Sequence, residues 1–502
     1  MALPFDGNPP ILSALVFLPL LAMALAWAVK TARQAFALGV AASALELALA
    51  VWLLGAFQGD VPGLQFVVRV PVTPFLSYHL GVDGVSVLFV ALTALLTLLV
   101  ILYGEIVHER PAGLYVASVF AFEAVLMGLF LSVDLLEFWG ASALEMIPAV
   151  FILRRWSLGQ DQRRALFGYV RHMAGGLGRM LAAILIIGWR HAESAGTWSF
   201  ALGDLLQTPI ARPQQSVPFM LFFYALAVRM ALFPFHAWLP VVAQQGPLAT
   251  VCVFLVGLKV GVYALLRFVL PLLPDACQRW KSFVVGLAVA GIFYGALLAL
   301  MQINLRRLLA FSAVSQTGML VVGVFCLNRE GLQGSLLLAI DFGVAASALL
   351  FVAGVLHRST RTTLLPRLGG MFDNLPLLGM TFLLAALSTM AMPGTPGFDA
   401  AHLMLEGAIE AHHWGVAVAI AAGSVASAAF LLWAFQRVFL ARRRDTALRP
   451  EKIRLSIPEV VLVGALCTVQ LGVGFYAEPW LEIVDDSLAA LAGQTASHAR
   501  QP

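Results

Sequence analysis

A succession of apolar runs, each about 20 residues long, extends from residue 11 to residue 475. The hydrocarbon core of a bilayer is about 30 Å thick and a helix rises about 1.5 Å per residue, so a run of this length spans a membrane. The runs are continuous and show no two-residue alternation, which favours helices over a barrel. Charged residues make up only 12% of the 502 residues, and no polar stretch is long enough for a soluble domain. The sequence therefore predicts an all-α, polytopic membrane protein.

The chain divides into fourteen predicted spans. The first run, residues 11–29, has no basic region ahead of it, so we expect a retained helix rather than a cleaved signal peptide. The other thirteen spans are predicted at residues 35–57, 84–103, 113–133, 135–153, 167–189, 217–239, 247–270, 283–302, 308–326, 331–356, 376–411, 414–436 and 457–475.

Basic residues are distributed unequally between the two sets of connections. Nineteen lie in connections that follow odd-numbered spans, Arg306 and six residues between 442 and 454 among them, and seven lie on the opposite side. Cytoplasmic loops carry the excess of lysine and arginine. The asymmetry predicts an even number of spans, with both termini on the non-cytoplasmic side. We expect the membrane to be a bacterial plasma membrane.

Two proline-containing segments interrupt the apolar runs, one at residues 231–240 and one at residues 391–398. Proline removes a backbone donor and clashes with the preceding turn, so each segment should break its helix. Broken helices at membrane depth persist only where protein or a water-filled cavity satisfies the freed backbone groups. Two breaks, one in each half, predict an inverted-repeat transporter with its site near mid-membrane.

Ionisable residues recur inside the apolar runs. Each charge at the bilayer centre costs about 2.5–3.5 kcal/mol on insertion scales, so these groups must face one another or water. A row of protonatable groups is what proton movement requires. The residues inside the runs are Glu46, Glu123, Glu145, Arg179, Arg229, Lys259 and Asp341, and Asp399, His402 and Glu406 follow the second interruption.

Several of these residues also fit a structural role. Glu123 and Glu145 are either proton carriers or ion-pair partners of Arg179 or Arg229, and Glu46 is expected to be structural. Lys259 lies between two glycines, Gly257 and Gly261, which permit close helix contact.

The acidic and histidine residues that follow the second interruption form a separate group. Asp399, His402 and Glu406 share one helix face if the helix continues after the break, where they would form a relay or cap a helix end. His412 and His413 are expected in an outer loop.

No redox or catalytic centre is visible. The four cysteines are scattered without metal-ligand spacing, and there is no phosphate-binding loop, nucleophile elbow or pair of histidines at zinc spacing. We expect no catalytic residue, metal or cofactor in this chain.

Five segments resemble the M-type antiporter-like subunit of respiratory complex I, which is related to Mrp-type cation/proton antiporter subunits. These are residues 78–86, 134–156, 229–274, 306–316 and 392–395. The similarity covers most of the chain from about residue 75 to 440. It implies two inverted five-helix repeats in which helices seven and twelve are broken. The implied division is residues 1–112 for helices one to three, 113–270 and 283–436 for the two repeats, and 437–502 for a basic inner loop, helix fourteen and a C-terminal tail.

The proton path of that family uses a glutamate of helix five and lysines of helices seven and eight. Here Lys259 stands at the helix-eight lysine and Arg229 at the helix-seven lysine. Arginine stays protonated in proteins, so Arg229 supplies a field but does not cycle a proton. The helix-five position is Ala143, and the nearest acid, Glu145, points about 200° around the helix.

Three further positions of the family pattern are substituted. Gln316 and Phe342 stand where the family has histidines of helices ten and eleven, and Ala401 replaces the helix-twelve glutamate. The proton path predicted for this chain is therefore Lys259, Arg229, Glu145, Glu123, His236, Asp341, Asp399, His402 and Glu406.

The resemblance implies a proton-translocating subunit of a complex I-type NADH:quinone oxidoreductase. Its partners would be other membrane subunits, the lipid bilayer and protons or Na⁺, with redox chemistry and quinone confined to other subunits and no nucleic acid bound. Three alternatives share the fold: a subunit of an Mrp-type antiporter, the membrane partner of an inorganic-carbon uptake complex, and a non-conducting scaffold. No lateral extension is expected after the fourteenth span, which argues against the long L-type subunit.

Overall fold

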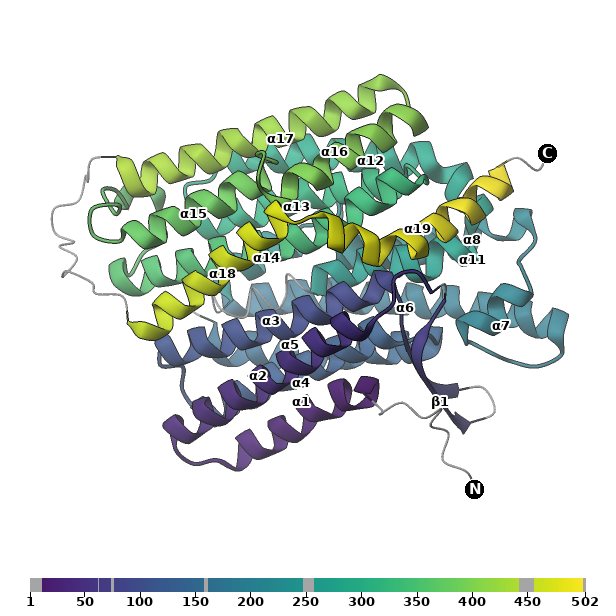
Figure 1. Cartoon of the computed structure of the whole chain (residues 1–502), viewed down its shortest axis with the longest axis horizontal. Coiled ribbons are helices and arrows are strands. Elements are labelled where there is room, and N and C mark those ends of the chain that lie inside the picture. Colours follow the sequence, from purple (N-terminus) through teal and green to yellow (C-terminus); the bar gives the residue numbers. More distant parts are fainter. Residues whose placement is uncertain are drawn as a thin grey trace.

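The computed structural model describes residues 11–61, 63–73, 76–157, 161–246, 257–441 and 456–499. Within these ranges eleven helices are long and apolar enough to cross a membrane, which confirms the all-α, polytopic fold (Figure 1). They are α1 (Ile11–Ala28), α2 (Ala32–Ala56), α3 (Gly84–Ile106), α4 (Ala112–Leu131), α5 (Leu135–Trp156), α6 (Gln162–Ala195), α12 (Pro274–Leu300), α13 (Leu305–Val324), α14 (Arg329–Thr360), α17 (Trp414–Phe435, continued by η4, Gln436–Leu440) and α18 (Ile457–Phe475).

Two further predicted spans are broken helices. The first consists of α8 (Ser216–Arg229) and α9 (Trp238–Gln245), and the second of α15 (Pro376–Thr389) and α16 (Pro396–Ala411). Both breaks fall at the predicted proline-containing segments. A proline stands in the first turn of the second half of each broken helix, Pro240 in α9 and Pro396 in α16. A missing backbone donor is tolerated in a first turn.

The eighth predicted span is described only in part. It is helical from residue 257 to residue 272 and includes η2 (Leu265–Val269) and α11 (Leu270–Leu272). Residues 247–256, which hold Pro247 and Cys252, lie outside the described residues, as do residues 442–455 with six of the basic residues counted above. The eleven spans and the two broken helices are compatible with the predicted total of fourteen.

The order of elements repeats along the chain. A first group of α4, α5, α6, the α8–α9 helix and the 257–272 helix is followed by α12, α13, α14, the α15–α16 helix and α17. In each group the broken helix is fourth and packs on the long third helix, α6 or α14. Since each group has five members, the second crosses in the opposite direction from the first.

The end of the bundle at which α1 begins and α18 ends carries a β-hairpin, and we call it the hairpin end (Figure 1). Strand β1 (Gln65–Thr73) pairs antiparallel with β2 (Leu76–Val82), so that Val68 faces Leu80. Short elements at this end are α7 (Leu202–Gln207) and η1 (Arg212–Gln214), and η3 (Leu365–Arg367) lies at the other end. The hairpin was not predicted from the sequence, because its strands are much shorter than a span.

The segment after α18 forms α19 (Glu478–Ala499), which lies along the hairpin end and contacts α3, α11, α12 and α14 (Figure 1). The prediction that no lateral element follows the last span is therefore wrong for these 22 residues. A second difference concerns Arg306, which was counted in a connection. It lies in the first turn of α13, is only 4% exposed, and donates a hydrogen bond to the Gly246 carbonyl.

Candidate functional site

The first helix break carries a buried ion pair. Arg229 is the last residue of α8, and its guanidinium donates to the Glu145 carboxylate of α5. Both residues are more than 90% buried. Of the two roles considered for Glu145, the structure shows the contact that the ion-pair role requires.

Lys259 lies beside this pair, on the 257–272 helix, and is 1% exposed. The two glycines that flank it allow the close approach expected from the sequence. A Cβ on Gly257 would lie 3.0 Å from Glu145 Oε1, and one on Gly261 would lie 3.0 Å from Met230 Cβ. The lysine is thereby held against the first break.

Asp341 faces Lys259 from α14, at a separation where their charges interact. The Lys259 ammonium also lies 4.3 Å from the ring centre of Phe342, a cation–π contact. Asp341 Oδ1 accepts a hydrogen bond of 2.5 Å from Ser388 at the end of α15. A Cβ on Gly397, at the start of α16, would lie 3.0 Å from Asp341 Oδ2. Asp341 thus connects the buried lysine to the second break.

Helix α13 satisfies backbone groups at both breaks. Thr317 donates to the Met230 carbonyl (3.1 Å) at the first break, and Gln316 donates to the Thr389 carbonyl (3.1 Å) at the second. Gln316 also donates to the hydroxyl of Ser427 in α17 (3.2 Å). A carbonyl freed by a helix break is costly in hydrocarbon unless a donor reaches it. Adjacent residues of one helix therefore stabilise both interruptions.

A second buried ion pair was not predicted. Asp83 caps α3 by accepting from the backbone N–H groups of Val85 and Ser86, and its other carboxylate oxygen accepts from Arg267. Arg267 lies two turns beyond Lys259 and is 7% exposed. Both residues belong to segments that carried the family resemblance, but nothing in their sequence spacing of 184 residues indicates that they meet.

His236 lies in the first break, between α8 and α9, and is 7% exposed. Its ring packs against Phe233, Tyr294 and Phe311, and its Nδ1 atom has no hydrogen-bond partner among the described residues. The structure therefore places it beside the row formed by Glu145, Arg229, Lys259 and Asp341, which we call the central row.

Asp399, His402 and Glu406 lie on one face of α16, as the spacing predicts. His402 and Glu406 are exposed, and Asp399 is partly so. His402 stacks on Phe398, whose side chain is also exposed. This face points away from the central row, toward the lipid or a neighbouring protein.

Glu123 does not meet either arginine proposed as its partner. Arg229 is held by Glu145, and Arg179 lies on the exposed face of α6, with its guanidinium 4.2 Å from the Tyr224 ring centre. Glu123 instead faces Glu46 of α2, and both are fully buried. The ion-pair role considered for Glu123 is wrong in this structure.

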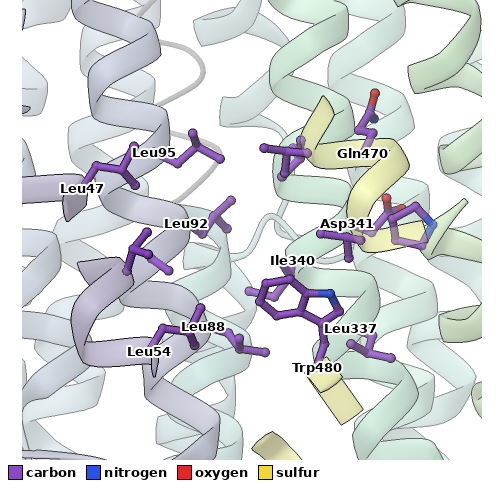
Figure 2. A pocket seen from close by; sticks show the side chains of 16 residues that line it. Leu47, Leu54, Leu88, Leu92, Leu95, Leu337, Ile340, Asp341, Gln470 and Trp480 are labelled. Atoms are coloured by element: carbon purple, nitrogen blue, oxygen red, sulfur yellow. The ribbon is translucent and has the colours of Figure 1, made fainter. Parts of the chain in front are cut away.

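An apolar cavity of about 280 Å³ borders Asp341. Figure 2 shows Asp341 and Gln470 on one wall, with Trp480 below them and leucines of α2 and α3 opposite. Both amide atoms of Gln470 are buried without a hydrogen-bond partner in the described part of the chain. Because the lining is almost entirely hydrocarbon, this cavity suits lipid chains rather than a file of water.

No group of three or more histidine, cysteine, aspartate or glutamate side chains with metal-binding geometry occurs among the described residues. The central row consists of two carboxylates, one lysine and one arginine, and it lies between the two broken helices. Fold and row together define a multi-pass membrane protein of the broken-helix transporter class.

Comparisons with known proteins assign this class more closely. A family profile described as "NADH:quinone oxidoreductase/Mrp antiporter, TM" matches residues 132–427. NADH-ubiquinone oxidoreductase chain 4 of Marchantia polymorpha is 30% identical over 97% of both chains. NADH-quinone oxidoreductase subunit M of Escherichia coli (strain K12) is 30% identical over 89% of both. The chain belongs to the NADH:quinone oxidoreductase/Mrp antiporter membrane-subunit family.

Solved structures agree with that assignment. A chain of respiratory complex I from Thermus thermophilus with bound NADH matches with a TM-score of 0.87 and 29% identity, over 96% of this chain and 99% of that chain. A chain of the Mrp complex from Dietzia sp. DQ12-45-1b matches with a TM-score of 0.82 and 20% identity, over 97% and 99% of the two chains. The second likeness concerns the fold alone.

Proposed function

We propose that this chain is a proton-translocating, antiporter-like subunit of a complex I-type NADH:quinone oxidoreductase. Other subunits carry out the electron transfer, and this chain couples it to proton movement. The two curated relatives described above, each 30% identical, carry the names of NADH:quinone oxidoreductase subunits, and the complex I chain is 29% identical. The Mrp chain is only 20% identical, which supports a complex I-type assembly over an Mrp antiporter.

The observation that carries the proposal is the buried Lys259 between two helix breaks. An amine with a flexible stem releases and regains a proton when its surroundings change, unlike a guanidinium. Asp341 stabilises the charged lysine, and burial opposes it. A change in the charge or position of Asp341 would therefore alter how tightly Lys259 holds its proton.

The test is proton flux through the assembled complex in proteoliposomes. Lys259→Ala is expected to lower electron-transfer-driven flux by about tenfold or more, the effect of about 1.4 kcal/mol on a rate-limiting barrier. Lys30→Ala, which changes an exposed lysine outside the row, is the matched control. Unchanged flux in assembled Lys259→Ala would remove the lysine from the mechanism.

A non-conducting scaffold is the second candidate, because the cation of the first break is an arginine. Arg229 is permanently charged and paired with Glu145, so this part of the row does not cycle a proton. Wild-type chain that assembles but carries no flux, with Lys259→Ala indistinguishable from it, would favour the scaffold.

The orientation in a bacterial plasma membrane is part of the proposal. The excess of lysine and arginine in connections at the end opposite the hairpin supports a cytoplasmic location of that end. The termini would then lie on the non-cytoplasmic side. A single cysteine introduced at exposed Glu482 of α19 should react with a membrane-impermeant thiol reagent added outside intact cells.

A further inference from the structure

Two buried glutamates face one another where α2 packs on α4. Glu46 and Glu123 are both 0% exposed, and their carboxyls are close enough to interact electrostatically. None of their four carboxylate oxygens meets the geometry of a hydrogen bond to any described residue. Two fully buried carboxyls, neither with a hydrogen bond of standard geometry, therefore lie within electrostatic reach of each other outside the central row.

No cation faces this pair among the described residues. Helix α1, which packs on both α2 and α4, has no ionisable residue between Ile11 and Ala28. Helix α3 offers the Thr97 hydroxyl beside Glu123. Arg33 of α2 lies thirteen positions before Glu46, about 20 Å along the helix axis.

The carboxylates of neighbouring α5 are occupied elsewhere. Glu145 is paired with Arg229, and Glu137 accepts from the His79 backbone N–H (3.1 Å) and from Ser132 (3.3 Å). His79 itself lies at the hairpin end, with its Nδ1 unpartnered. The electrostatic environment of the pair therefore consists of the two carboxyls themselves and one threonine hydroxyl.

Physical chemistry restricts the states open to such a pair. Two carboxylates within electrostatic reach of each other in hydrocarbon repel, and each unpaired charge costs several kcal/mol, so both do not remain ionised. One proton placed between them converts two unsatisfied oxygens into a donor and an acceptor of a charge-assisted hydrogen bond. A proton is the ligand that fits, since it satisfies both groups and needs no further coordinating oxygens.

We propose that Glu46 and Glu123 form a shared proton-binding site at the α2–α4 contact. The site takes up and releases one proton while the central row is active, and so stores a proton beside the row. Arg229 keeps Glu145 ionised, because the arginine is permanently charged. The pair of Glu46 and Glu123 instead changes its charge when a proton binds or leaves. The inference rests on the proposed function, because release of the proton requires a transport cycle.

The principal experiment compares proton flux and infrared spectra of the assembled complex in proteoliposomes. Wild-type protein should show a carbonyl stretching band of a protonated carboxyl at neutral pH, shifted in D₂O. Glu46→Gln/Glu123→Gln replaces both acids by neutral groups of the same shape, and should abolish this band and lower flux by about tenfold or more. Glu482→Gln, which alters an exposed carboxyl of α19, should change neither.

The single variants guard against loss of folding in the double variant. Glu46→Gln and Glu123→Gln each leave one carboxyl beside a neutral amide. That carboxyl stays protonated but no longer shares its proton with a carboxylate, so each variant should shift the carbonyl band from its wild-type position and reduce flux. Glu46→Asp keeps a titratable group and should restore part of the flux. Assembly is checked by the amount of subunit that co-purifies with the complex.

Three outcomes would overturn the inference. Full flux in the assembled double variant means that the pair takes no part in transport. A carbonyl band that persists in both single variants and in the double variant comes from another residue. A band that disappears when Na⁺ is added at constant pH means that the pair binds a metal cation instead. Lys259→Ala, measured in the same preparation, separates this result from failure of the proposed function, which requires the flux to depend on that lysine.

Discussion

Arg229 and Glu145 show how one substitution changes the chemistry of a buried position. The arginine at the end of α8 keeps its positive charge at every physiological pH. In the structure its partner is the Glu145 carboxylate on α5. The pair satisfies both charges, but it also ties the Glu145 carboxylate to one partner. In the proposed mechanism, proton transfer in this row therefore depends on Lys259 and Asp341.

Removing one member of this pair should destabilise the chain strongly. Arg229→Ala leaves Glu145 buried without a cation, which costs about 3–5 kcal/mol. Arg229→Ala/Glu145→Ala should recover most of that loss, and Arg229→Lys should assemble normally. Thermal unfolding of the purified complex measures the effect.

The matched control for this cycle is a surface ion pair. Arg329→Ala breaks the contact with Asp485, where the side chains are 51% and 30% exposed, and should cost less than about 1 kcal/mol. Equal losses in Arg229→Ala and Arg329→Ala would contradict the assignment of Arg229 to a buried pair.

His412 gives a prediction about pH outside the membrane-spanning segments. Burial lowers the pKa of His412, the Lys281 ammonium lowers it further, and a hydrogen bond to the Phe325 carbonyl (3.0 Å) opposes both. The unfolded chain, with a histidine pKa of about 6.5, then binds the proton more readily than the folded chain. The contribution of His412 to stability is therefore complete above about pH 6.5 and declines as the pH falls below it.

The measurement is the unfolding temperature at about pH 5.5 and about pH 7.5, on either side of that value. His412→Gln should show a smaller difference between the two than wild type. His413→Asn, which changes the adjacent exposed histidine but retains a side chain that caps α17, should behave as wild type. A wild-type difference that survives in His412→Gln must come from another group.

At the scale of elements, the two broken helices depend on one intact neighbour. Helix α13 packs on α9, α16 and α17, and Gln316 and Thr317 reach both breaks with their hydrogen bonds. Glycines permit the close contacts at the breaks, and Gly397 is the tightest of them. A Cβ there would lie 2.0 Å from the Ser388 carbonyl oxygen.

Gly397→Ala should therefore disturb the second break. The added methyl group has no room between α15 and α16, and overpacking of this kind costs about 1–3 kcal/mol or more. Gly128→Ala in α4, where no atom lies within 4 Å of the new Cβ, should be neutral or stabilising by about 0.5–1 kcal/mol. The amount of assembled subunit and its unfolding temperature distinguish the two, and a neutral Gly397→Ala would show that the break relaxes freely.

At the scale of the molecule, α19 joins the two halves at the hairpin end. It contacts α3 on one side and α12 and α14 on the other, and Asp485 accepts from Arg329 (2.6 Å) and Gln333 (2.7 Å). Leu488, a residue of α19, is 0% exposed. The apolar face of this helix carries most of its attachment, since exposed ion pairs contribute little.

Two substitutions in α19 separate these contributions. Leu488→Ala should destabilise the chain by about 2–5 kcal/mol. Asp485→Asn should cost no more than about 1 kcal/mol, because Arg329 remains solvated and the amide oxygen still accepts from Gln333. Thermal unfolding checks both values, and a larger loss in Asp485→Asn than in Leu488→Ala would show that α19 is held by its charges.

The positions of the spans and of both breaks follow from local chemistry. A helix must be long enough to cross the hydrocarbon, and proline cannot continue one. The eleven described spans and both breaks could therefore be located approximately from hydropathy and proline alone. Two further features could be predicted from local sequence, because helical periodicity determines them. One is the close helix approach at Gly257 and Gly261, and the other is the shared helix face of Asp399, His402 and Glu406.

The tertiary structure decided which ionisable groups meet. Asp83 and Arg267 are 184 residues apart, and Glu145 and Arg229 are 84 apart, so helix rotation and packing select the partners. The same packing places Glu46 near Glu123, and it leaves Asp399, His402 and Glu406 on the face of α16 that points away from the central row. The sequence shows that a charge lies inside an apolar span, and such a charge must be paired or face water. Which group becomes its partner depends on the free energy of packing many helices together.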